Sequence, residues 1–398
     1  MTLSTNVAKV QPSITLAISA KAKALKAEGI DVIALSAGEP DFPTPRHICD
    51  AAIDAINAGF TVYTPASGTL ELKDAVRRKL KRDNGIDYAT SQIIIDCGAK
   101  HSIFLAVFAL TGKDDEVIIP TPYWVSYPEM VQLAGGVPVI VDCPQEQGMK
   151  MTPDQLRTAI TPRTKLLILT SPSNPTGMVY TREELAALAE VIVESGIYVL
   201  SDEIYEKLLY DGAEHVSIAS LSNEIYRRTI SVNGVSKAYC MTGWRIGYAA
   251  GPTDIIKGMA NIQSHETSNP TSISQKAALA AIEGSYDFLK PMLMEYDKRR
   301  KYVVERLNAI AGVNCIEPKG AFYVFPDVSG VYGGTIPGGA KITGSFDFCD
   351  YMLDNHRIAI VPGIGFGADN HVRISYATSM DNLKKALDRF EAGVAALT

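Results

Sequence analysis

The sequence predicts an α/β fold in which a mainly parallel seven-stranded sheet is flanked by helices, with a smaller α+β domain beside it. Short runs rich in β-branched residues alternate with amphipathic segments through the middle of the chain, which is the pattern of a layered α/β core. The apolar runs are nearly continuous, as at residues 166–169, and this is typical of parallel strands that are buried on both faces. Beyond about residue 300 this alternation ends, which indicates a second domain.

The large sheet is expected to contain seven strands. They are predicted at residues 93–96, 116–119, 137–142, 165–170, 197–201, 229–232 and 247–250. Helices are expected between several of these strands, and the clearest covers residues 182–194. Thr181 and Glu184 stand at its start in the T-x-x-E pattern of a capping box, in which each side chain bonds the backbone amide of the other residue.

Both ends of the chain are expected to build the smaller domain. A long helix is predicted over 285–310 and a glycine- and proline-rich loop over 331–344. The other C-terminal elements expected are strands at 321–325, 358–361 and 371–376, and helices at 346–355 and from Asp381. The predicted division is 1–45 as an N-terminal arm and part of the small domain, 46–299 as the large cofactor-binding domain, and 300–398 as the C-terminal small domain.

The composition excludes several classes of protein. The 398 residues include 46% hydrophobic residues, which is too many for an intrinsically disordered chain and enough for a large core. With 38 basic against 44 acidic residues the net charge is −6, so a nucleic-acid partner is not expected. No apolar run approaches the roughly 20 residues of a membrane span, and no signal peptide is recognisable, so a cytoplasmic location is expected. The scattered cysteines and histidines lack metal-site spacing, so no metal is expected.

Four polar segments follow predicted strands, at the edge of the sheet where open α/β proteins bind their ligands. They are residues 96–100, 171–177, 202–205 and 233–237. Gly98 and Ala99 open a helix, where free amides and the helix dipole favour a phosphate. A plain strand–helix turn is the alternative interpretation of these two residues.

Lys237 follows one of these strands in an apolar and aromatic neighbourhood. A lysine there is either a solvated surface residue or, when desolvated, a nucleophile. Ser236 adds a hydroxyl beside it, and Arg245, eight positions on, can bind an anion through two N–H groups. Asp202 ends another strand, either as a turn residue or as a carboxylate that holds a cationic ring nitrogen. A Schiff-base lysine with an aspartate on a pyridinium nitrogen is the recurring pyridoxal-phosphate arrangement.

Five motifs occur in a characteristic order along the chain. They are Asn174-Pro-Thr-Gly177, Ser201-Asp-Glu-Ile-Tyr205, Ser236-Lys237, Gly243-Trp-Arg-Ile-Gly247 and His371-Val-Arg-Ile-Ser375. With them the chain resembles the fold-type I pyridoxal-phosphate aminotransferases over nearly its whole length. Two further segments, Ala37-Gly-Glu-Pro-Asp-Phe42 and Tyr123-Trp-Val-Ser-Tyr-Pro-Glu-Met130, are similar to the class I subgroup that includes bacterial 1b aspartate aminotransferases.

The resemblance implies a pyridoxal 5′-phosphate cofactor. It implies that Lys237 carries the cofactor as a Schiff base and moves protons, and that Asp202 pairs with the ring nitrogen. Tyr205 and Asn174 are implied to hydrogen-bond the ring oxygen, and Trp124 to stack on the ring. The residues implied at the cofactor phosphate and its helix are Gly98, Ala99, Lys100, Ser236 and Arg245. On the residues alone, Trp124 could instead belong to the core and Asn174 to a turn.

The resemblance also implies a homodimer with shared active sites, in which Tyr63 reaches the cofactor phosphate of the neighbouring subunit. Its small-molecule partners are amino acids and 2-oxo acids. Arg373 is implied to clamp the substrate α-carboxylate, and the residues implied to help it are Asn174, Trp124 and the backbone of Gly38.

The second carboxylate of a substrate is implied to meet Lys100 and Thr15, the latter beside Ser13, although Lys100 could also be a plain helix-face lysine. The implied reaction moves the amino group between L-aspartate or glutamate and 2-oxoglutarate or oxaloacetate in a ping-pong cycle. Prephenate, aromatic or alanine-type aminotransferases remain alternatives, and Gln11 stands where prephenate-using relatives usually have lysine. Two further alternatives are another pyridoxal-phosphate enzyme such as a C–S lyase and a non-catalytic descendant of the family.

Overall fold

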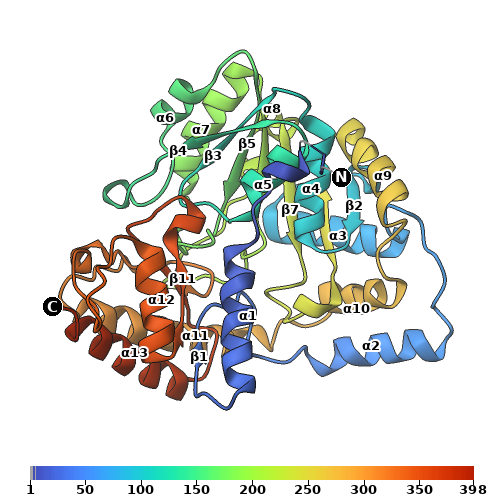
Figure 1. The fold of residues 1–398 in the computed structure, drawn as a ribbon. Helices are drawn as coiled ribbons and strands as arrows, with labels where there is room; N and C mark the ends of the chain where they lie inside the picture. The colour runs from blue at the N-terminus through green and yellow to red at the C-terminus, as the bar shows by residue number, and fades with distance from the viewer. Residues whose placement is uncertain (1–2, 5) are drawn as a thin grey trace.

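A seven-stranded sheet lies at the centre of the computed structural model, which describes residues 3–4 and 6–398 (Figure 1). In spatial order its strands are β2 (Ile93–Asp96), β8 (Gly247–Ala250), β7 (Thr229–Gly234), β6 (Tyr198–Asp202), β5 (Thr164–Thr170), β3 (Glu116–Pro120) and β4 (Val137–Val141). β8 runs antiparallel to both β2 and β7, and the remaining neighbours are parallel. The predicted, mainly parallel sheet and all seven of its strands are confirmed.

The alternation of side chains explains why the strands are apolar throughout. On β5, Leu166 and Ile168 pack into one core cluster, while Leu167 and Leu169 pack into another. Both faces of the sheet are therefore covered by helices, as a parallel sheet requires. The helices joined to this sheet are α2 (Arg46–Asn57), α3 (Leu70–Asn84), α4 (Ala99–Leu110), α5 (Ser126–Leu133), α6 (Pro153–Ala159), α7 (Arg182–Ser195), α8 (Asn223–Tyr226), α9 (Thr253–Glu266) and α10 (Ser272–Glu283).

The start of α7 has the predicted capping box. The amide of Glu184 donates to Oγ1 of Thr181 at 3.3 Å, and the amide of Thr181 donates to Oε2 of Glu184 at 2.8 Å. Two backbone donors that the first helical turn leaves unpaired are satisfied in this way.

A smaller unit packs beside the large sheet. Its helices are α1 (Ile14–Ala27), α11 (Leu289–Asn308), α12 (Ser345–His356) and α13 (Met380–Ala395), and its strands are β1 (Ile33–Ala34), β9 (Tyr323–Val324), β10 (Ile358–Ala359), β11 (Val361–Pro362) and β12 (Val372–Ser375). β1 pairs in parallel with β10, so the N-terminal segment joins the C-terminal unit as expected. β12 pairs antiparallel with β11 and β9.

Several predicted elements differ in extent, and the strand expected at 321–325 covers only Tyr323–Val324. The single strand expected at 358–361 is two strands, because β10 pairs with β1 whereas β11 pairs with β12. The helix expected over 285–310 begins only at Leu289, since the segment before it forms a turn in which the amide of Asp287 donates to Oγ of Ser285. Across the described part of the chain, no helix is both long and apolar enough to cross a membrane.

Candidate active site

A cavity of about 590 Å³ lies where the carboxyl ends of the large sheet's strands meet α1 and the C-terminal unit. The predicted site residues that line it are Thr15, Gly38, Ala99, Lys100, Trp124, Asn174, Asp202, Tyr205, Ser236, Lys237, Arg245 and Arg373. They come from eight separate regions of the sequence, and the fold brings them together on the walls of one cavity. A cavity of this size suits a small molecule.

Lys237 follows β7, and its side chain reaches across the cavity floor. Its Nζ donates to the backbone carbonyl of Gly38, a residue more than 190 positions earlier in the chain. Burial, reinforced by the positive charge of Arg373, lowers the pKa of Lys237 to about 8. A lysine with this pKa is about one-tenth neutral at pH 7, far more than an ordinary lysine, and the neutral form is the nucleophile and proton acceptor.

Asp202 ends β6 and is 5% exposed. Its Oδ1 accepts from the amide of Ile204 at 3.2 Å, and its Oδ2 accepts from the hydroxyl of Tyr127 at 2.7 Å. Burial raises the pKa of Asp202 to about 6, and the two donors oppose this rise. The carboxyl group is therefore ionised at neutral pH, and it can pair with a cationic nitrogen in the cavity.

Arg373 projects from β12 and is 3% exposed. Its Nη1 donates to Oδ1 of Asn174 at 3.0 Å, and its Nη2 donates to the carbonyl of Ser36 at 2.7 Å. The guanidinium carbon lies 4.6 Å from the ring centroid of Tyr323. Its Nε is buried and has no hydrogen-bond partner among the described residues. The guanidinium of Arg373 is therefore fixed in place but still has N–H groups without a partner, which suits it to bind a carboxylate.

The start of α4 forms the opposite end of the cavity. Gly98 precedes the helix with φ 94°, and the amides of His101 and Ser102 both donate to its carbonyl. Because the first amides of a helix have no partner within it, those of Ala99 and Lys100 remain to meet a ligand.

Arg245 lies against this turn. It has φ 56°, and its Nη1 donates to the carbonyl of Thr242 at 3.0 Å. A Cβ atom built at Gly98 would lie 2.5 Å from Nη2 of Arg245, so only glycine permits the approach. Gly98 itself does not line the cavity but allows the guanidinium to do so. With the buried Ser236, these groups make an anion site.

Lys100 and Thr15 line the cavity from different elements. The Nζ of Lys100 lies 4.7 Å from the ring centroid of Trp124, and burial together with Arg245 lowers the pKa of this lysine. Oγ1 of Thr15, on α1, is 2.9 Å from Oγ of Ser13. Lys100 thus lines the cavity although it is an exposed residue, and its contact with a second carboxylate stays a prediction.

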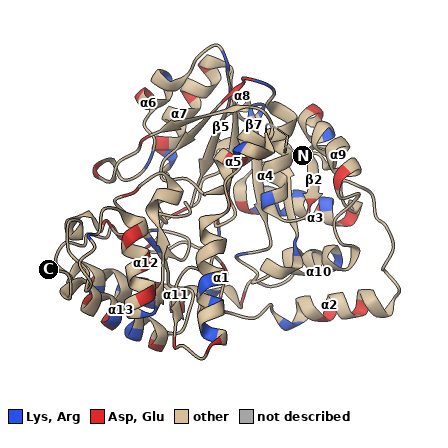
Figure 2. Cartoon of the chain, in the orientation of Figure 1, with Lys and Arg blue, Asp and Glu red and all other residues tan. Residues whose placement is uncertain are grey.

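Positive charge gathers at this cavity although the whole chain is acidic. Figure 2 shows basic residues along α1, and Lys23 and Lys26 of that helix line the cavity. Lys21, one turn away, instead pairs with Asp350 and Asp354 of α12. The acidic wall residues are Glu39 and Asp202, so cationic groups prevail and the cavity favours anions.

The comparisons with known proteins agree with this geometry. The family model described as aminotransferase class I and II matches residues 30–390. An aspartate aminotransferase of Geobacillus stearothermophilus is 52% identical over 389 residues, which cover 98% of each chain. The chain belongs to the class I and II aminotransferase family.

One further relative and one solved structure are also similar to this chain. An aspartate/prephenate aminotransferase of Cereibacter sphaeroides is 50% identical over 397 residues, covering 100% of this chain and 99% of the relative. The crystal structure of the aspartate aminotransferase from Rhizobium meliloti has a TM-score of 0.97 and 46% sequence identity, with 100% of both chains covered. The fold of this aminotransferase is thus the aspartate-aminotransferase fold.

Tyr63 is the one predicted site residue that this aminotransferase holds clearly apart from the cavity. Its side chain is 87% exposed, and it lines a shallow surface hollow together with Phe60 and Leu70. Within one chain, Tyr63 therefore contributes nothing to the cavity. The contribution to a neighbouring subunit stays a prediction.

Two aromatic residues of the aminotransferase site had no assigned role in the sequence. The hydroxyl of Tyr323 lies 2.9 Å from that of Tyr205, and its ring lies under Arg373. Tyr127 donates to Asp202. Tyr127 lies in the quoted segment 123–130 and Tyr323 in a predicted strand, but their partners are 75 and 118 residues away. Only the tertiary structure shows these pairings.

Proposed function

We propose that this aminotransferase binds pyridoxal phosphate and moves the amino group between L-aspartate or glutamate and 2-oxoglutarate or oxaloacetate in a ping-pong cycle. One observation carries the proposal: a single cavity holds a half-buried lysine of lowered pKa, a buried carboxylate and two separate cationic positions. Arg373 is the first of these positions, and Lys100 with Thr15 is the second. Two cationic positions suit a substrate with two carboxylates.

The residues of the cavity fit pyridoxal phosphate. In this proposal Lys237 would carry the cofactor, Asp202 would pair with its ring nitrogen, and Tyr205 and Asn174 would bond its ring oxygen; all four residues line the cavity. Trp124 provides a stacking surface. The close approach of Arg245 to Gly98, beside the amides at the start of α4, makes an anion cradle for the phosphate. When bound, the cofactor supplies a protonated pyridine ring as an electron sink for the pair left at the substrate Cα.

The chain's own groups perform the remaining work. The Asp202 carboxylate keeps the proton on the ring nitrogen, because an ionised carboxylate stabilises a neighbouring cation. Arg373, held by Asn174 and Ser36, orients the α-carboxylate. The amine of Lys237, when not attached to the cofactor, would accept the proton from the substrate Cα, and its pKa of about 8 suits both accepting and returning a proton.

Prephenate is a second candidate oxo acid, because the relative from Cereibacter sphaeroides is named an aspartate/prephenate aminotransferase. Gln11 is exposed and is not among the residues that line the cavity. Its backbone amide donates to Oε2 of Glu129 at 3.0 Å. The replacement of the usual lysine by Gln11 therefore does not change the wall of the cavity itself.

We also propose that the protein works as a homodimer in the cytoplasm. Val62, Tyr63 and Leu70 are 68%, 87% and 68% exposed, and such a group of large apolar side chains on one surface favours a protein partner. A second copy placed there would bring Tyr63 to the partner's phosphate site. We further propose 1–45, 46–299 and 300–398 as the domain division, since β1 pairs with β10 and α11 spans the last boundary.

A transamination panel tests the proposed function. The purified protein is incubated with pyridoxal phosphate, with aspartate, glutamate, phenylalanine or alanine as donor and 2-oxoglutarate, oxaloacetate or prephenate as acceptor. Fastest turnover is expected for aspartate with 2-oxoglutarate. Release of ammonia or of a cleaved side chain, in place of a new amino acid, would contradict transamination.

A further inference from the structure

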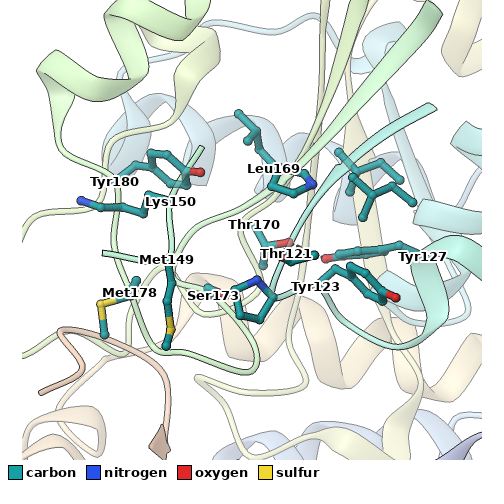
Figure 3. A pocket seen from close by; sticks show the side chains of 14 residues that line it. Thr121, Tyr123, Tyr127, Met149, Lys150, Leu169, Thr170, Ser173, Met178 and Tyr180 are labelled. Atoms are coloured by element: carbon teal, nitrogen blue, oxygen red, sulfur yellow. Dashed lines mark hydrogen bonds between the residues drawn. The ribbon is translucent and has the colours of Figure 1, made fainter. Parts of the chain in front are cut away.

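The carboxylate of Asp202 is held from behind by a residue without an assigned role. The hydroxyl of Tyr127 donates to Oδ2 of Asp202 at 2.7 Å and lies 2.6 Å from Oγ1 of Thr170. Tyr127 is 2% exposed, so water does not compete for its hydroxyl. Figure 3 shows the Tyr127 ring with its oxygen directed toward Thr170.

The chemistry of the three groups gives this chain of hydrogen bonds one direction. An ionised carboxylate only accepts, so the single hydrogen of the Tyr127 hydroxyl goes to Asp202. Tyr127 must then accept from Thr170, whose hydroxyl is the donor. Chains of this kind polarise each member, and the bond to the carboxylate is the strongest of them.

The fold fixes all three residues. Thr170 and Asp202 are direct partners in the register of β5 and β6, at the carboxyl ends of the two strands. Tyr127 lies on α5, and its amide donates to the carbonyl of Trp124 at 3.0 Å. The turn that leads into α5 thus links Trp124 to Tyr127, whose rings pack edge-to-face at 5.4 Å, and both residues line the cavity.

We propose that Tyr127 is a positioning residue of the reaction, which holds the Asp202 carboxylate ionised and correctly oriented toward the cofactor nitrogen, with Thr170 holding Tyr127. The inference rests on the proposed function, because it assigns Asp202 to that nitrogen. The amide of Ile204 fixes the other oxygen, so two donors behind the carboxylate leave lone pairs on both oxygens for a ligand. Tyr127 and Thr170 also line the large cavity, but the proposed role acts through Asp202 and does not require either of them to touch the substrate.

The electrostatic balance at Asp202 explains why this hydroxyl matters. Burial raises the pKa of Asp202 to about 6, and the hydrogen bond from Tyr127 is the largest influence that opposes the rise. Without that bond the pKa of Asp202 moves upward toward neutral pH. A protonated Asp202 no longer favours the positive charge on the ring nitrogen.

Tyr127→Phe tests the proposal, and the chain offers a matched control. Tyr180 is another buried tyrosine, and it lines the same small cavity of about 30 Å³ behind Tyr127 (Figure 3). Its hydroxyl accepts from the amide of Met151 at 2.8 Å, and it makes no contact with Asp202. Tyr180→Phe therefore removes a buried hydroxyl of the same kind from the same neighbourhood.

Three quantities are measured for each protein: the affinity of the apoprotein for pyridoxal phosphate by fluorescence titration, the pH titration of the bound cofactor's absorbance, and the kinetics with aspartate. Tyr127→Phe is expected to weaken cofactor binding and to lower kcat by about 10- to 100-fold each, the value of one lost hydrogen bond to a charged group. The absorbance titration is expected to shift, and KM for aspartate to stay within about twofold. Tyr180→Phe is expected to change none of these by more than about twofold.

Equal behaviour of the two variants would overturn the proposal, as would a loss in Tyr127→Phe that appears in KM alone. If Tyr127→Phe does not fold, Thr170→Val is used instead, because it removes the hydroxyl that donates to Tyr127. Thr170→Val is expected to shift the cofactor titration in the same direction by a smaller amount. An unchanged titration would refute the proposed role of Tyr127. In an Asp202→Asn background, Tyr127→Phe is expected to have no further effect on cofactor affinity, and an undiminished effect would show that it does not act through Asp202. A wild-type protein that fails to bind pyridoxal phosphate would instead refute the proposed function.

Discussion

Arg373 donates from Nη1 to Oδ1 of Asn174 at 3.0 Å, although the two residues are 199 positions apart. Arg373 lies on β12 of the C-terminal unit, and Asn174 follows β5 of the large sheet. The bond therefore joins the two units on the wall of the cavity. Since Ser36 accepts a second N–H group, the guanidinium is already oriented before a substrate arrives, and less ordering is left for binding to accomplish.

Lys237→Ala is expected to abolish turnover and the absorbance band of the Schiff base, because the variant lacks the amine of lowered pKa that the proposal assigns to both. The measurements are an absorbance spectrum with pyridoxal phosphate and an assay with aspartate and 2-oxoglutarate. Lys319→Ala is the control, since Lys319 pairs with Asp211 at 2.8 Å outside the cavity and should leave both unchanged. Turnover by Lys237→Ala near the wild-type rate would refute the assignment of the lysine.

Lys100→Ser is expected to raise KM for aspartate by about 10- to 100-fold, the value of one lost hydrogen bond to a charged group. KM for alanine, which has no second carboxylate, should change by less than about threefold. Arg373→Lys gives the contrasting result, because it loses the planar fork that binds the α-carboxylate and weakens both substrates alike. An equal rise for aspartate and alanine in Lys100→Ser would show that Lys100 does not bind the second carboxylate.

Mixing two impaired variants tests the shared active site. Tyr63→Ala is expected to be weakly active because the partner's phosphate site loses a hydroxyl, and Lys237→Ala to be inactive. A mixed dimer then has one intact site, so random pairing should restore about a quarter of the wild-type activity. The subunits are mixed after mild dissociation, and activity is compared with each variant alone. Activity that never exceeds that of the separate variants, once mixed dimers are confirmed by mass, would argue against Tyr63 reaching across.

The sequence predicted the fold well where the signal is local. The seven strands of the large sheet are short apolar runs, and Thr181 and Glu184 lie three residues apart, so each pattern is complete within a few residues. The split between β10 and β11 could not be predicted, because it depends on which remote strand each one pairs with.

The same reason separates the site residues that could be predicted from those that could not. Lys237 and Asp202 lie in recognisable motifs, whereas the roles of Tyr127 and Tyr323 depend on partners 75 and 118 residues away. Lys100 had two interpretations in the sequence, and its position over the ring of Trp124 favours the one at the site. Side chains that act through another residue leave no pattern of their own in a single sequence.

Asp96, the last residue of β2, predicts an unusual dependence of stability on pH. It is fully buried, and neither carboxylate oxygen has a hydrogen-bond partner among residues 3–4 and 6–398. Burial raises its pKa from 3.8 to about 7, which the nearby Ser102 opposes only in part. Between these two values the folded protein keeps a proton that the unfolded chain has lost, so the free energy of unfolding falls as pH rises, by about 1.4 kcal/mol per pH unit from this group.

Asp96→Asn removes this titration, because the amide is neutral at every pH. Relative to wild type, the variant is expected to gain stability steadily from about pH 5 to pH 7 and to keep the gain above that. Urea unfolding of both holoenzymes at half-unit steps of pH gives the difference, and Asp54→Asn on the exposed side of α2 is the control that should show no such trend. A difference between Asp96→Asn and wild type that stays constant from pH 5 to pH 8 would show that Asp96 is already ionised in the folded protein, and hence that a donor outside the described contacts satisfies it.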